Sequence, residues 1–161
     1  MTQRVQISVI GAAEGEEEIL HDAEEVGRGI AEAGAVLVCG ALSGVMEAAS
    51  RGASAAGGTV LGILPTLSPG DANPYVTHAV ATGTGHARNL AVVASGEAVI
   101  AVGGEWGTLS EIAYARKLGR PVIAVQSWSL RNRAGTDLGI VEAETAEQAV
   151  AEALAQSGAQ P

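Results

Sequence analysis

The sequence predicts a single α/β domain, Rossmann-like, in which helices cover both faces of a doubly wound parallel sheet. Two observations predict this class. Short apolar runs alternate with helical segments along the chain, and glycine-bearing turns repeatedly join a run to the helix that follows. The length of 161 residues and the apolar fraction of 47% suffice for one core, which must be aliphatic because there is no Phe. We therefore expect one domain over residues 1–161, with residues 156–161 as a frayed tail.

The first third of the chain predicts three strands and two helices. The strands are apolar runs bounded by glycine or polar residues, at residues 4–10, 35–38 and 59–64. The first helix, over residues 16–33, begins with three glutamates, which suit the positive end of a helix, and Gly34 ends it. The second helix follows a glycine-bearing turn at residues 39–46 and ends near residue 56, before two more glycines.

The middle of the chain continues the alternation. Residues 65–74 are rich in Pro, Ser, Gly, Asp and Asn and predict a loop, the longest connection in the chain. The elements expected after this loop are a strand at 75–81, a helix that ends at 95, a fully buried strand at 98–102 and a helix from Gly107 to 118.

The last part of the chain predicts two strands and a closing helix. Gly119 ends the preceding helix, and Pro121 introduces a strand at 122–125. Residues 128–136 are polar and irregular, and 138–141 predict a short last strand. The closing helix is expected over 143–155, with Glu144 or Thr145 near its cap.

The composition excludes several classes of protein. The net charge of −9 argues against DNA, RNA or an anionic membrane as a partner. A single cysteine, Cys39, excludes an internal disulfide and suits a reducing cytoplasm; its place at the end of an apolar strand predicts a buried small residue. We find neither a signal peptide nor an apolar run long enough to span a membrane, so we expect a cytoplasmic protein.

The stretch from residue 98 to 118 predicts a phosphate site. A buried strand ends at Gly103-Gly104, and Gly107-Thr108 opens a helix, whose free N–H groups and partial positive charge attract anions. Glu111 follows one turn into the helix, within reach of a ligand held by the loop. The alternative interpretation is a capping box formed by Thr108 and Glu111, and the spacing alone favours it.

Two other strand-to-helix turns carry candidate ligand-binding residues. Gly40, Ser43 and Gly44 form a second possible phosphate cradle, or an ordinary tight turn capped by Ser43. Arg88, followed by Asn89, lies in a first helical turn, where a cation opposes the helix dipole and so indicates a partner. That partner is a bound phosphate, a carboxylate such as Glu111, or a nearby acid on the surface. In parallel sheets all such turns lie at the same edge, where ligands bind.

The sequence gives little support for a dinucleotide site or a metal site. No glycine turn has the spacing of a dinucleotide fingerprint, so a nicotinamide-type site is weakly supported. His78 and His86 lack a third ligand at metal spacing, so we predict no metal site.

Together these motifs resemble the LOG superfamily, often labelled lysine decarboxylase-like, along nearly the whole chain. The family pattern P-G-G-x-G-T-x-x-E is matched by residues 103–111, with Arg88 upstream, and the pattern G-G-x-x-x-G-x-M resembles residues 39–46. The chain departs from the pattern at Gly103, which replaces a proline, at Glu105, which replaces a glycine, and at Asn89, where LOG enzymes usually have lysine. With these departures, the chain is more similar to the branch of the molybdenum cofactor carrier proteins than to the LOG enzymes.

The resemblance implies a cytoplasmic homodimer that binds a phosphorylated nucleotide or a pterin-type cofactor. No resident cofactor is implied, since a nucleotide or the molybdenum cofactor would be cargo. The rival implication is a phosphoribohydrolase that cleaves the N-glycosidic bond of nucleoside 5′-monophosphates with Arg88 and Glu111, and a further one is a nucleotide sensor without turnover. Decarboxylation with pyridoxal phosphate is not expected, because Lys117, the only lysine, lies late on its helix, away from the predicted ligand edge.

Overall fold

Seven parallel strands form one sheet in the order β4-β3-β2-β1-β5-β6-β7 in the computed structural model of the chain, which describes residues 4–158. The strands are β1 (Gln6–Ile10), β2 (Val36–Cys39), β3 (Thr59–Leu64), β4 (His78–Ala81), β5 (Ala98–Val102), β6 (Val122–Val125) and β7 (Ile140–Ala143). The chain builds outward from β1 to β4, then crosses to β5 on the other side of β1 and builds outward again. The predicted doubly wound parallel sheet is therefore confirmed.

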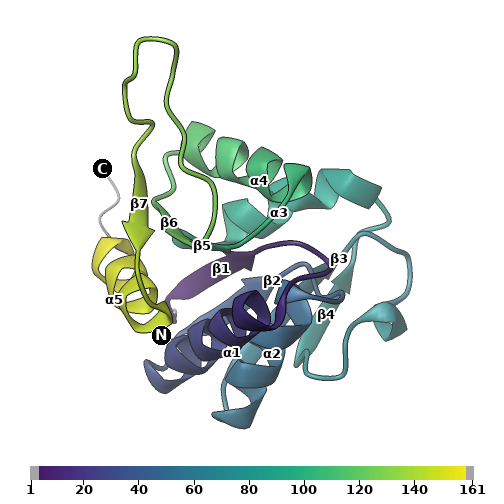
Figure 1. Ribbon diagram of the computed structural model, residues 1–161. Helices are drawn as coiled ribbons and strands as arrows, with labels where there is room; N and C mark the ends of the chain where they lie inside the picture. Colours follow the sequence, from purple (N-terminus) through teal and green to yellow (C-terminus); the bar gives the residue numbers. More distant parts are fainter. Residues whose placement is uncertain (1–3, 159–161) are drawn as a thin grey trace.

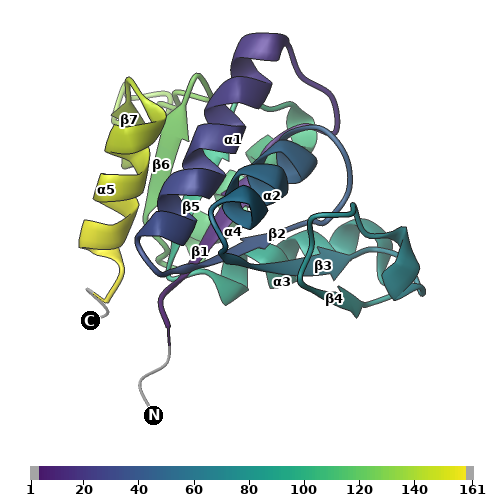
Figure 2. The same cartoon turned by 90° about the horizontal axis from the view of Figure 1, so that it is seen from below.

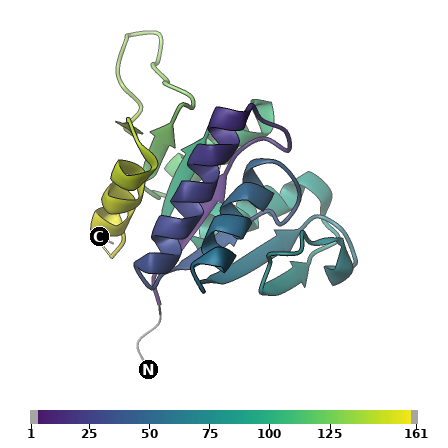
Figure 3. The ribbon, with the colours of Figure 1, turned by 60° about the horizontal axis from the view of Figure 1, so that its bottom comes forward.

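Five α-helices cover the two faces of this sheet (Figure 1). One face carries α1 (Glu17–Glu32), α2 (Val45–Ala55) and α5 (Ala146–Gln156), which lie side by side in Figures 2 and 3. The other face carries α3 (Arg88–Ser95) and α4 (Trp106–Lys117). Two 3₁₀ turns, η1 (Pro69–Asp71) and η2 (Gly85–Ala87), lie in the connections.

The core consists of small aliphatic side chains in two clusters, one on each face of the sheet. Ile7 and Val9 of β1 face α1 and α2, and Ile10 faces α3 and α4. Helices α1 and α2 lie so close together that a Cβ on Gly27 or Gly52 would overlap a backbone carbonyl of the opposite helix. The contact is possible because glycine has no side chain at these two positions. Glycine is therefore used here for helix contact.

Some predicted boundaries are wrong at the ends of elements. Strand β4 begins at His78 instead of residue 75 because the Asn73 side chain accepts a hydrogen bond from the Tyr75 amide and holds a turn there. Helix α5 begins at Ala146 because Thr145, one of the two predicted caps, accepts a hydrogen bond from an amide of the first turn. Of the predicted frayed tail, Gln156 belongs to α5, and residues 159–161 lie outside the described part of the chain.

The connection between β6 and β7 rises from the sheet as an arm over residues 126–139 (Figure 1). An antiparallel bridge between Arg131 and Asp137 joins its two sides. Over residues 4–158, no helix has the length and apolar character needed to cross a membrane.

Candidate functional site

A pocket of about 290 Å³ opens at the carboxyl edge of the sheet, where the chain crosses from one side of β1 to the other. In doubly wound sheets this crossover is where ligands bind, because the loops diverge there. The loops after β1, β2 and β5 and the start of α3 contribute its walls. Six of the residues predicted for the site line it: Gly40, Arg88, Asn89, Gly107, Thr108 and Glu111.

Arg88 is the buried cation of this pocket. It is the first residue of α3, its exposed fraction is 8%, and its Nε atom is buried without a hydrogen-bond partner. The guanidinium lies against Gly40, where a Cβ would overlap Nη1 and lie 2.7 Å from the Met46 sulfur. Burial lowers the pKa of Arg88, and the neighbouring Glu111 opposes that shift. A glycine at the end of β2 is thus needed to accommodate the guanidinium.

Glu111 is the buried carboxyl of the same pocket. It lies on α4 with an exposed fraction of 6%. Burial raises its pKa to about 7, and the positive charge of Arg88 limits that rise. The ion pairs formed within residues 4–158 join Arg28 and Arg51 to α1 glutamates and do not include Arg88 or Glu111. The pocket therefore holds two buried ionisable groups that influence each other without forming a salt bridge.

The capping box predicted for Thr108 and Glu111 is wrong. Helix α4 begins at Trp106, with Glu105 as its N-cap residue, so Thr108 is already the third helical residue. The helix starts earlier than the glycine pattern predicted, and this moves Glu111 from the cap into the buried face of α4. Its carboxyl is thereby directed to the pocket.

The turn between β2 and α2 supports a neighbouring loop. Ser43 was expected either in a phosphate cradle or as a helix cap, but Gly44 takes the N-cap position, and the Ser43 hydroxyl donates a hydrogen bond to the Ala13 carbonyl oxygen at 2.9 Å. Gly44 has a φ of +64°, and a Cβ there would overlap the backbone of Ala12 and Ala13. Ser43 and Gly44 are therefore not among the residues that line the pocket; they hold the β1–α1 loop that does.

Gly103 and Gly104 shape the turn between β5 and α4. Their φ angles are +55° and +114°, and proline, whose φ is fixed near −65°, is excluded from the conformation of Gly103. A Cβ on Gly104 would lie 2.6 Å from the Thr108 hydroxyl oxygen. Neither glycine is among the pocket-lining residues; both lie in the turn that leads from β5 into α4.

Part of the pocket lining was not predicted from the sequence. Gly11, Ala12 and Ala13 follow β1 and form part of the wall of the pocket. A Cβ on Gly11 would lie 2.6 Å from the Val45 Cβ and 2.7 Å from the Val102 carbonyl oxygen. A glycine directly after the first strand was the available signal. The other missed lining residues are Val9, Leu42, Met46 and His86; Glu105, which departs from the LOG pattern, also lines the pocket.

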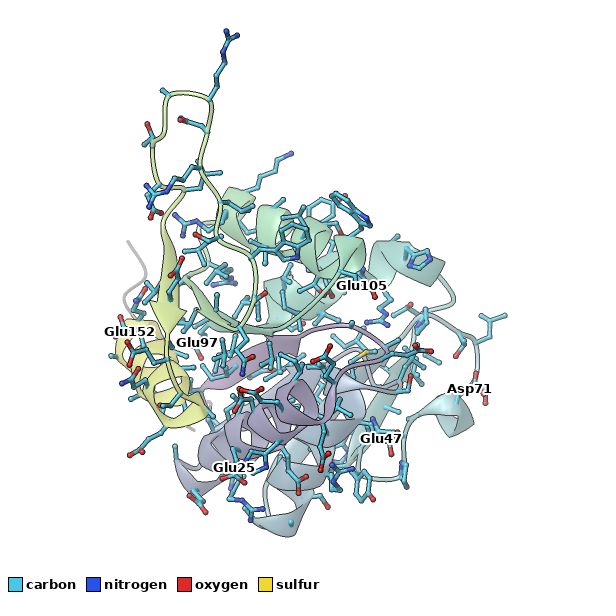
Figure 4. All side chains as sticks on the ribbon, in the orientation of Figure 1. Glu25, Glu47, Asp71, Glu97, Glu105 and Glu152 are labelled. Carbon is cyan, nitrogen blue, oxygen red and sulfur yellow. The ribbon has the colours of Figure 1, made fainter. Side chains whose placement is uncertain are left out.

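Glu105 lies at the rim of the pocket, at the beginning of α4. Its side chain is exposed and forms no cap hydrogen bond with the helix. Figure 4 shows Glu105 well away from Glu152 on α5 and Glu25 on α1. It therefore adds a negative charge to the side of the pocket where the α4 amides begin.

Comparison with known proteins gives the chain its family. The model of the SLOG cluster4 family matches residues 4–158. The chain belongs to this family. A relative in Archaeoglobus fulgidus, described only as an uncharacterised protein, is 48% identical over 122 residues, which cover 76% of this chain and 80% of the relative.

Two solved structures of similar length resemble this SLOG cluster4 chain. The molybdenum cofactor binding protein of Rippkaea orientalis is 34% identical, with a TM-score of 0.86 over 96% of this chain and 98% of that one. The molybdenum cofactor carrier protein of Chlamydomonas reinhardtii is 31% identical, with a TM-score of 0.81 over 98% of this chain and all of that one. The predicted resemblance to the LOG superfamily and its carrier branch is confirmed.

Two other features of this SLOG cluster4 chain lie outside the pocket. The rings of Trp106 and Trp128 have centroids 5.6 Å apart, and Trp106 remains 77% exposed; neither ring is among the pocket-lining residues. A second hollow of about 440 Å³ lies between α1 and α5. Its charged lining residues are three glutamates and Arg28, so it is not suited to an anion.

Proposed function

We propose that this protein is a cytoplasmic carrier that binds a phosphorylated pterin-type cofactor or nucleotide, with the molybdenum cofactor as its cargo. The observation that carries this proposal is the buried guanidinium of Arg88, which faces the pocket without an ion-pair partner among the described residues. A buried charge without a partner is costly, and an anionic ligand would compensate it. The cofactor-binding and carrier proteins that the chain resembles support the choice of cargo.

The start of α4 supports a phosphate subsite. The first turn of a helix has amides without intrahelical partners, and Gly107 and Thr108 of this turn line the pocket. Apart from its chain neighbours and the backbone of its own helix, nothing in the described residues lies within 4 Å of the position that a Cβ on Gly107 would occupy, so the backbone there is open to a ligand. In a chain of net charge −9, this helix end and Arg88 supply the local attraction that an anion needs.

Cofactor loading tests the proposal. Purified protein is mixed with molybdenum cofactor released from a molybdoenzyme and desalted, and bound molybdenum and bound pterin are quantified. We expect both to remain with the wild type and to fall at least tenfold with Arg88→Ala. Arg133→Ala is the matched control, since Arg133 is an exposed arginine on the β6–β7 arm. Equal retention by wild type and Arg88→Ala, or no retention by the wild type, contradicts the proposal.

A second candidate function is hydrolysis of a nucleoside 5′-monophosphate by water to the free base and ribose 5-phosphate. The placement of Arg88 and Glu111 in one pocket favours it, because cleavage of the N-glycosidic bond develops positive charge on the ribose that a carboxylate stabilises. Chromatography of reactions with a panel of nucleoside 5′-monophosphates tests it. Base release that disappears with Glu111→Gln supports the hydrolase; binding without base release supports the carrier.

We further propose that the protein is a homodimer that associates through the outer face of α3 and α4. This face exposes large apolar side chains, and α3 carries no acidic residue, so two acidic molecules meet there with little repulsion. The exposed apolar residues are Leu90, Trp106, Tyr114 and Leu118. Light scattering on a size-exclusion column tests this: we expect a dimer for the wild type and a monomer for Tyr114→Glu, and a monomeric wild type contradicts it.

A further inference from the structure

Glu111 is a largely buried residue of the pocket wall whose carboxyl accepts no hydrogen bond from the described residues. Its exposed fraction is 6%, and its pKa is shifted by burial and by the charge of Arg88 alone, with no hydrogen bond contributing. Its oxygens are not among the fully buried side-chain atoms that lack a partner, so they are open to the pocket, where a ligand can reach them. Because Glu111 lines the pocket, a ligand is the natural source of the missing donor.

The position of Arg88 restricts what that ligand is. The guanidinium is held against Gly40 and Met46, and it forms no ion pair with Glu111. A single ligand that satisfies both groups must present an acceptor or an anion to Arg88 and N–H donors to Glu111. A phosphate alone satisfies Arg88 and leaves Glu111 without a donor.

We propose that Glu111 determines ligand specificity by accepting the paired N–H groups of a 2-amino-4-oxopyrimidine edge, the edge that guanine and pterins share. This inference rests on the function proposed above. The ring N–H and the exocyclic amine of this edge are adjacent and parallel, and they match the two oxygens of one carboxylate. The neighbouring oxo group is an acceptor for Arg88. Adenine has an unprotonated ring nitrogen at this position, which a carboxylate repels.

The rest of the pocket is compatible with a flat ring. Leu42 and Met46 contribute apolar wall, and the open amides of the first turn of α4 remain available for the phosphate. The charged or titratable groups that share the pocket with Glu111 are Arg88 from α3, His86 from η2 and Glu105 at the start of α4. Since the ionised carboxylate accepts both N–H groups, the preference for the edge should strengthen as the pH rises from 6 to 8.

Calorimetric titration with three nucleotides tests the proposal. Guanosine, inosine and adenosine 5′-monophosphates share ribose and phosphate, so ratios of their dissociation constants isolate the base edge. Inosine lacks only the 2-amino group. We expect guanosine monophosphate to bind about tenfold more tightly than inosine monophosphate, and adenosine monophosphate to bind most weakly. Glu111→Gln should bring the guanosine-to-adenosine ratio close to one. Glu105→Gln, which removes the exposed carboxylate of the rim, should change all three affinities together and keep their ratios.

The possible failures are distinguishable. Equal affinities for the three nucleotides in the wild type, or a guanosine preference that persists in Glu111→Gln, overturns the role of Glu111. Cofactor retention without any nucleotide binding also overturns it and leaves the carrier function standing. Loss of both cofactor retention and nucleotide binding in the wild type overturns both proposals. The wild-type series and its pH dependence need no variant, so the test holds even where Glu111→Gln does not fold.

Discussion

The guanidinium of Arg88 lies against the α-carbon of Gly40, in the space that a Cβ would fill. Gly40 follows β2 directly, and Arg88 begins α3, so the contact joins the end of a strand to the first residue of a helix that covers the sheet. The glycine leaves room for the arginine, and the arginine gives the pocket its positive charge. This relationship makes the charge of the pocket depend on a residue that carries no side chain.

Gly40→Ala should therefore weaken binding of an anionic ligand about tenfold, equivalent to about 1.4 kcal/mol. The added methyl group must displace Nη1 of Arg88 or the Met46 sulfur, with a loss of about 1 to 3 kcal/mol in the free energy of unfolding. Calorimetric titration and thermal unfolding measure the two effects. Gly70→Ala is the matched control, because its Cβ would lie 3.4 Å from the Ser68 hydroxyl, at ordinary contact distance in an exposed turn. Equal ligand affinity in the two variants would contradict the role given to Gly40.

Arg88→Met should separate binding from stability. The substitution removes a buried charge that has no ion-pair partner among the described residues, so the free energy of unfolding should stay constant or rise by about 1 kcal/mol. Ligand binding should be lost. Denaturant unfolding at pH 6 measures the stability, since Glu111 is then mostly neutral. A large loss of stability would show that Arg88 is a structural residue.

Glu111 should make stability depend on pH. Its pKa is raised from 4.5 to about 7, so the folded state binds a proton that the unfolded state releases between these values. The free energy of unfolding that Glu111 contributes therefore falls as the pH rises from 4.5 to 7, by about 3 kcal/mol at most. Glu111→Gln should be more stable than the wild type at pH 8, with a smaller difference at pH 5. Denaturant unfolding of both proteins across this range is the measurement, and a constant difference contradicts the burial of an unpaired carboxyl.

Glu105→Gly should strengthen phosphate binding. The glutamate occupies a glycine position of the LOG pattern and places a negative charge at the pocket rim beside the α4 amides. Removing it should tighten binding of a nucleoside monophosphate about threefold to tenfold, more at low salt than at high salt. The free energy of unfolding should fall by about 0.5 kcal/mol, because a carboxylate at the start of a helix interacts favourably with the helix dipole. Titrations at two salt concentrations decide this, and weaker binding by the variant would mean that Glu105 contacts the ligand.

The sequence carried enough information for the fold and for one edge of the site. Periodicity and glycine turns predicted the sheet, with β3, β5 and β6 bounded as observed. The turns after β2 and β5 were found because their glycines precede helices. The contribution of Gly11 was missed, because its significance depends on β1 being the central strand, which is a property of the strand order.

The role of Glu111 was beyond local reasoning. A spacing of three residues between Thr108 and Glu111 fits a capping box, and only the start of α4 at Trp106 excludes it. The same holds for Ser43, whose hydroxyl bonds to Ala13, a residue thirty positions earlier in the chain. Such contacts are set by packing between distant segments, which a pattern along one segment does not encode.

Hydrogen exchange with and without the molybdenum cofactor tests the central claim most directly. We predict that the bound ligand protects amides at the start of α4, over residues 105–111, and in the loops that follow β1 and β2. Amides of α1 and α5 around the second hollow should exchange at unchanged rates. Protection confined to α1 and α5, or unchanged exchange throughout at saturating cofactor, would contradict a ligand site built on Arg88 and the start of α4.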